Sequence, residues 1–186
     1  LAAAQDALAR DPEHPNAHIN AGVAARGLGD LETARRHLEE AVHIAPSDPD
    51  AQLQLGGTLV RLHQMYAAIA AYIRAIGEAH REEGRSELLI ERSVDGLAAV
   101  TPSTPLAEPL RSLCDGVRWL TTGDLGRAYQ RLECARDGAL DDETVRMAAE
   151  ALLGHVWRHR ALATPTDPNN DRNQRGGDLV HFGPLR

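Results

Sequence analysis

The spacing most suggestive of chemistry in this sequence is a pair of histidines near its end. In the run His155-Val-Trp-Arg-His159, two imidazoles stand one helical turn apart, which is the spacing of a helical metal pair. The glutamate that follows the first histidine in zinc peptidase helices is absent from this run, and no third ligand lies nearby in the sequence. A solvated helix face is the favoured interpretation, so we predict no metal site here.

Other reactive side chains lack the neighbours that catalysis needs. Ser86, Ser93 and Cys114 are candidate nucleophiles without a catalytic pattern beside them. Acidic pairs such as Glu39-Glu40 are typical of solvated helix faces, and no glycine-rich phosphate loop of standard form occurs. We therefore predict that the chain is not an enzyme and has no catalytic residues and no cofactor.

Composition narrows the classes of partner. The net charge of -7 over 186 residues argues against nucleic acid, which would need a basic face. No apolar run approaches the roughly 18 residues of a membrane helix, so we expect no membrane insertion. The two cysteines give no disulfide framework, which favours a cytoplasmic location. All twenty basic residues are arginine, which indicates a GC-rich genome, and we expect a bacterial protein.

The elements that must position any functional residue follow a repeat of 34 residues. Small and large apolar residues recur at this step, each at a fixed place in the repeat, and a fixed period of this length is typical of stacked helix pairs. The matched positions are Pro12 and Pro46, Gly22 and Gly56, Ala34 and Ala68, and Leu38 and Tyr72. Asp30 follows a glycine-rich turn and is expected to cap the second helix of its pair.

Proline, glycine and aspartate divide the chain into four parts. We predict repeats over 1–83 with the first one truncated, a non-repeat helix and proline-rich linker over 84–105, a degenerate unit and a capping helix over 106–161, and a flexible tail or connector over 162–186. The chain begins within a helical pattern, and we expect it to be a fragment of a longer protein.

These positions resemble the tetratricopeptide repeat family. The resemblance is good from Leu1 to His80 and looser from Pro109 to Leu140. It implies an all-α fold, a right-handed α-solenoid of antiparallel helix pairs, in which the first helix of each pair lines a concave groove. We expect about nine helices followed by an irregular C-terminal tail. Members of the family bind an extended peptide or a partner helix in the groove and are not catalytic by themselves.

The resemblance also implies which residues line the groove. They are Asn16, Ile19, Val23 and Arg26 in the first full unit, and Asp50, Leu53, Gly57, Val60 and Arg61 in the second. Members that clamp the C-terminal carboxylates of chaperones have lysine and asparagine at such places, where this chain has isoleucine, valine, leucine and glycine. We therefore expect no carboxylate-clamp cochaperone. An apolar groove edged by Arg26 and Arg61 suits a peptide with aliphatic anchors and an acidic residue.

Three functions stay open on the sequence alone. We favour a scaffold or adaptor that binds a protein or peptide partner, although Ile19 and Leu53 could instead pack between repeats. The chain could alternatively be an accessory or regulatory domain of a larger bacterial enzyme, such as a transferase or hydroxylase. In the third case it is a structural module that self-associates, with the tail segment around Phe182 lying in a neighbour's groove.

Overall fold

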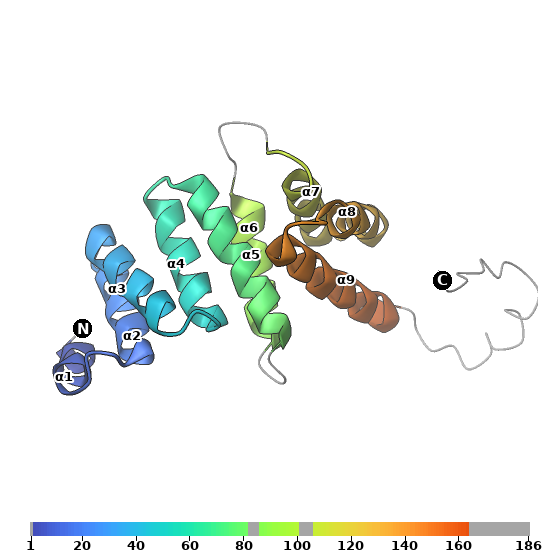
Figure 1. The fold of residues 1–186 in the computed structure, drawn as a ribbon. Coiled ribbons are helices and arrows are strands. Elements are labelled where there is room, and N and C mark those ends of the chain that lie inside the picture. Colours follow the sequence, from blue (N-terminus) through green and yellow to red (C-terminus); the bar gives the residue numbers. More distant parts are fainter. Residues whose placement is uncertain (1, 82–85, 101–105, 164–186) are drawn as a thin grey trace, which may run out of the picture.

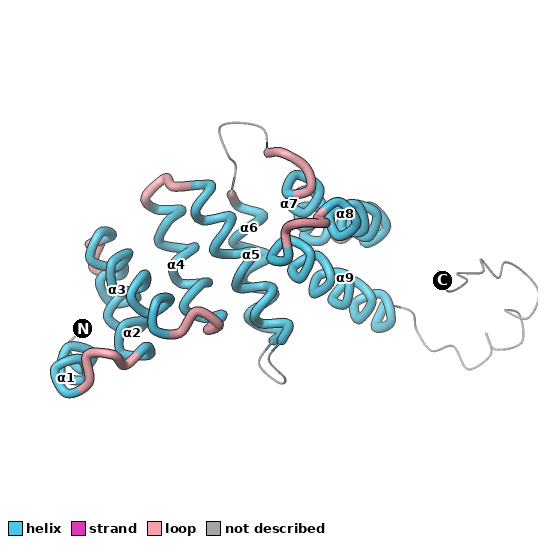
Figure 2. Tube along the Cα trace, in the orientation of Figure 1, coloured by secondary structure: helices cyan, strands magenta, loops and turns pink. Residues whose placement is uncertain are grey.

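The computed structural model describes residues 2–81, 86–100 and 106–163, and within these ranges the chain forms nine helices and no strand (Figure 2). The helices are α1 (Ala2–Arg10), α2 (Pro15–Gly27), α3 (Leu31–Ile44), α4 (Pro49–Arg61), α5 (Met65–Arg81), α6 (Ser86–Ala99), α7 (Leu110–Thr121), α8 (Leu125–Gly138) and α9 (Glu143–Ala163). The predicted tail from residue 164 onward and the linker core at 101–105 lie outside the described residues, as does Phe182.

Local signals in the sequence set where the helices begin. The carboxylate of Asp30 accepts a hydrogen bond from the backbone N–H of Thr33 at 3.1 Å, so the expected cap of α3 is present. Asp124 caps α8 in the same way through the N–H of Arg127, at 3.0 Å. A proline stands in the first turn of both α2 and α4, where its missing N–H costs no helical bond.

Each helix pair closes over a glycine of its first helix. A Cβ atom placed on the glycine would lie less than 3 Å from the large side chain that faces it, so only glycine permits this approach. The distances from the added Cβ atom are 2.6 Å at Gly22 to Leu38 Cγ, 2.9 Å at Gly56 to Tyr72 Cε1 and 2.8 Å at Gly116 to Leu132 Cγ. Residues 110–138 thus pack as a pair like the two before them.

The pairs stack side by side along the molecule (Figure 1). Helix α6 packs against both α4 and α5, which places it where the first helix of a further pair would lie. The pair α7 and α8 follows, and α9 packs on α8 and then returns to lie against α5 (Figure 1). Helix α9 therefore contacts an element more than sixty residues earlier in the chain.

The main hydrophobic core runs without a break from α4 to α9. Its largest fully buried side chains are Ile69, Ile76, Ile90, Leu113, Leu132 and Leu152. A smaller cluster holds α2, α3 and the start of α4 together and consists of Ile19, Leu38, Ala41 and Ala51. None of the helices in the described ranges has both the length and the apolar composition needed to cross a membrane.

Candidate functional site

The candidate groove is the face that the first helices share. Helix α2 contacts α4, and α4 contacts α6, whereas the second helices α3 and α5 approach each other less closely. In a curved stack the elements that come closest together lie on the inside of the curve. The inner face is therefore formed by α2, α4 and α6, and all nine residues predicted for the groove lie on the first two of these helices.

Two of the nine residues are buried. Ile19 is 5 % exposed and belongs to the small cluster between α2 and α3, and Leu53 is 6 % exposed and belongs to the main core. Both side chains therefore contribute apolar area to the packing of the repeats. They leave little surface for a ligand to touch.

Other groove residues reach the surface. Val23 is 37 % exposed, and Asn16 and Arg61 are also exposed. Gly57 and Val60 are partly buried. The accessible part of the inner face therefore has an apolar point at Val23 and polar groups around it.

Arg26 is committed to the junction between α2 and α4. Its Nη1 donates to the backbone oxygen of Gln54 at 2.9 Å and to Thr58 Oγ1 at 3.4 Å, and its Nη2 donates to Gln54 Oε1 at 2.6 Å. Arg61 Nη1 donates in return to the backbone oxygen of Arg26 at 2.8 Å. The two arginines thus tie successive first helices together in both directions.

Gly57 and Asp50 complete this arrangement. A Cβ atom at Gly57 would lie 3.1 Å from Arg26 Nη1, so the glycine leaves room for the guanidinium. The carboxylate of Asp50 accepts a hydrogen bond from Gln54 Nε2 at 3.0 Å, which orients the amide so that its oxygen faces Arg26. Two residues predicted to line the groove therefore support the inter-repeat network.

Positive charge gathers at this part of the inner face. Burial lowers the pKa of the Arg26 guanidinium, and the charges of Arg61 and Arg92 lower it further, while Tyr72 and Asp50 raise it. Three successive first helices each contribute one of these arginines. The cluster offers an anionic group of a ligand more than one cation.

Sequence reasoning missed Gln54, Thr58 and Arg92. Gln54 and Thr58 are one helical turn apart on α4, and such a polar pair facing a neighbouring helix is a signal that could have identified the acceptors of Arg26. Arg92 lies on α6, outside the two matched repeats, so the 34-residue step did not point to it.

The histidine run near the end of α9 does not form a metal site among the described residues. His155 is buried, at 4 % exposure, whereas the side chain of His159 lies outside the described part of the chain. Among the side chains that the structure describes, no three metal-binding groups converge.

Comparison with known proteins bears on the helical stack just described. A family model described as "Tetratricopeptide repeat" matches residues 1–49 and, in a second overlapping position, residues 24–84. The match confirms the expected family and, together with the stacked helices, the expected all-α helical solenoid. The curated proteins gave no significant match.

Proposed function

Because the chain belongs to the tetratricopeptide repeat family through residues 1–84, we propose that it is an adaptor that binds a peptide or helix of a partner protein along the inner face of α2, α4 and α6. Repeats of this family generally mediate protein–protein interactions and are typically non-catalytic.

The observation that carries the proposal is the exposed side chain of Val23 beside a cluster of arginines. Val23 offers apolar area on an otherwise polar face, and burying it against an aliphatic side chain is favourable. Arg61 and Arg92 supply guanidinium groups, each of which can donate two parallel hydrogen bonds to one carboxylate. The ligand is therefore a segment with an aliphatic residue and an acidic residue.

The network around Arg26 supports a preformed binding surface. Because Arg26 already bonds to Gln54 and Thr58, the spacing of α2 and α4 is fixed before a ligand arrives. A ligand then does not have to order the two helices. Ordering them on binding would cost free energy and so reduce the affinity. Arg26 acts here by positioning the helices, while Arg61 is exposed to the ligand.

The test is capture of partners from an extract of the source organism, with the chain as bait and mass spectrometry as the readout. The variant is Val23→Glu, which places a charge at the apolar point without disturbing a buried side chain. Leu140→Glu is the matched control, because Leu140 is 87 % exposed and lies between α8 and α9, away from the inner face.

We expect a protein that the wild type and Leu140→Glu both retain and that Val23→Glu loses, while circular dichroism stays helical for all three. Equal capture by Val23→Glu and by the wild type would overturn the proposed groove. Leu53→Glu is unsuitable as the variant, because Leu53 is buried and a charge there would unfold its neighbours.

A further inference from the structure

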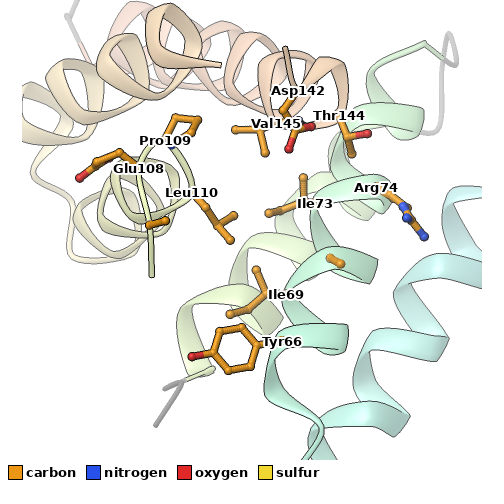
Figure 3. Close-up of a pocket in the computed structure, with 12 residues that line it drawn as sticks. Tyr66, Ile69, Ile73, Arg74, Glu108, Pro109, Leu110, Asp142, Thr144 and Val145 are labelled. Atoms are coloured by element: carbon orange, nitrogen blue, oxygen red, sulfur yellow. Dashed lines mark hydrogen bonds between the residues drawn. The ribbon is translucent and has the colours of Figure 1, made fainter. Parts of the chain in front are cut away.

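Two hollows lie on the side of α5 that faces α9. The first has a volume of about 360 Å³ and lies between α5, the segment before α7 and the start of α9 (Figure 3). The second has a volume of about 270 Å³ and lies between α5, α9, the end of α3 and the start of α4. Arg74 and Thr144 line both hollows, so the two are neighbours along α5.

The hollows are on the opposite side of the stack from the candidate groove. Second helices and α9 supply most of their lining, and α4 supplies only Gln52. Gln52 precedes Gly57 by five residues, which corresponds to a rotation of roughly 140° around a helix of 3.6 residues per turn. A ligand in the hollows would therefore not touch the inner face.

Gln52 is the feature that indicates a ligand in the second hollow. Its side chain is 3 % exposed, and its Oε1 atom has no hydrogen-bond donor within the described part of the chain. A buried acceptor without a donor destabilises a fold, whereas leucine at this position would avoid the cost. Its presence in the wall of a cavity is explained if a ligand supplies the missing N–H.

The charged groups around the hollows narrow the chemistry of that ligand. The carboxylates are engaged within the chain: Glu78 with Arg81, Glu143 with Arg146, Asp142 with the N–H of Val145 and Glu108 with the N–H of Ser112. Arg74, in contrast, is exposed and has no ion-pair or hydrogen-bond partner among the described residues. The Gln52 Oε1 acceptor and the guanidinium donors of Arg74 are therefore available to a ligand, as is the hydroxyl of Thr144 that lines both hollows.

The first hollow adds an apolar wall. Figure 3 shows Ile73, Leu110 and Val145 pointing toward one another from three elements, with Ile69 and Tyr66 further along α5. Such a wall accommodates an aliphatic or aromatic side chain. An N–H donor, a C=O acceptor and a neighbouring apolar side chain are what one stretch of peptide backbone presents.

We propose that these two hollows together form a second binding site, which holds an extended peptide segment of a partner protein. One backbone N–H of the peptide donates to Gln52 Oε1, a carbonyl accepts from Arg74, and an apolar side chain fills the space beside Ile73 and Val145. The lining of α5 runs from Tyr66 to Arg81, about 22 Å of helix, which an extended peptide covers with about seven residues.

The test uses a phage-displayed library of random heptapeptides, selected on the full chain carrying Val23→Glu so that the inner face is impaired. A recovered peptide is synthesised with a fluorescent label, and its Kd is measured by anisotropy on that chain with and without Gln52→Leu. We expect peptides with an aliphatic or aromatic residue, binding at least tenfold more weakly to the Gln52→Leu chain. The thermal unfolding midpoint of that chain should be equal to or above that of its parent.

A scan of N-methylated peptides separates the hydrogen bond from a general change of shape. Methylation of the one N–H that donates to Gln52 should weaken binding at least tenfold on the parent chain and much less on the Gln52→Leu chain. Failure to enrich any peptide would overturn the second site, as would equal Kd values on the two chains. The groove is tested separately by Val23→Glu in the capture experiment, so the two proposals can fail independently.

Discussion

Gly96 of α6 lies directly against the ring of Tyr72 in α5. A Cβ atom at Gly96 would be 2.4 Å from Tyr72 Cζ, and on α4 a Cβ atom at Gly56 would be 2.9 Å from Cε1 of the same ring. One tyrosine therefore fits between glycines of two successive first helices. The approach of α6 to the repeats before it depends on this fit.

Gly96→Ala should lower the free energy of unfolding by about 1–3 kcal/mol, because the added methyl group overlaps the ring and forces α6 away. Chemical denaturation measures the change. Gly77→Ala is the matched control: its Cβ atom would lie 3.5 Å from Met147 Cβ, an ordinary contact, so we expect no loss and a gain of up to about 1 kcal/mol from helix propensity. Equal effects of the two substitutions on the free energy of unfolding would contradict the close fit of the Tyr72 ring against Gly96.

His63 lies 34 residues after Gly29 and has the same left-handed backbone, with φ of +59° against +86°. This conformation costs a residue with a Cβ atom about 1–2 kcal/mol. His63→Gly should therefore stabilise the chain by about 0.5–1 kcal/mol after the greater flexibility of glycine in the unfolded state is counted. Gly29→Ala should lower the free energy of unfolding, because alanine is strained in the left-handed conformation. Nothing lies within 4 Å of the Cβ position at Gly29, so backbone strain is the only source of this loss. If His63→Gly destabilises the chain instead, the imidazole makes a contact whose contribution to stability exceeds the backbone strain.

The stability of the α2–α3 pair should depend on pH through two histidines. His18 Nε2 donates to the carbonyl of Pro12 at 2.9 Å, so when neutral its Nδ1 accepts from His37 Nδ1 at 3.1 Å. Burial lowers the pKa of His37, and the charges of His18 and Arg36 lower it further. The unfolded chain therefore takes up this proton at a higher pH than the folded chain does.

The stabilisation is thus complete above the ordinary histidine pKa and is lost as the pH falls through the folded value. The thermal unfolding midpoint of the wild type should fall more between pH 7.5 and pH 5 than that of His37→Phe, which cannot titrate at this position. If both midpoints follow the same course, other groups control the acid sensitivity.

The two thiols should react at very different rates. Burial raises the pKa of Cys114 to about 11, while Cys134 is exposed. At pH 8 only about one Cys114 in a thousand is a thiolate, and it is also shielded from reagent. We expect a disulfide reagent such as DTNB to modify one thiol per folded chain rapidly and the second only on unfolding. Cys134→Ser should remove the rapid phase; a rapid phase that persists would mean that Cys114 is accessible.

The repeat period predicted the part of the fold that local packing determines. The 34-residue step matched Gly22 with Gly56 and Leu38 with Tyr72, and in the structure each glycine faces the large side chain of its own helix pair. Short loops and close glycines act within one helix pair, so their signals remain readable in a single sequence. The return of α9 to α5 left no such signal, because its contacts join residues far apart in the chain.

The candidate groove was predicted less completely for a related reason. Ile19 and Val23 are one turn apart on α2, yet the first is buried and the second is 37 % exposed. Spacing identifies a helix face, but the neighbouring helix covers part of that face, and the covered part depends on the curvature of the stack. Arg26 likewise has the length to reach either a ligand or α4, and only the positions of Gln54 and Thr58 decide between them.

The contact between α9 and α5 also determines how the molecule can come apart. In an open array of repeats each unit touches only its neighbours, so the array can unravel stepwise from either end. Here α9 cannot detach without exposing α5, in the middle of the stack, and re-forming the contact requires closure of a loop of about sixty residues. Because the main core is continuous from α4 to α9, we expect these six helices to unfold as one cooperative unit.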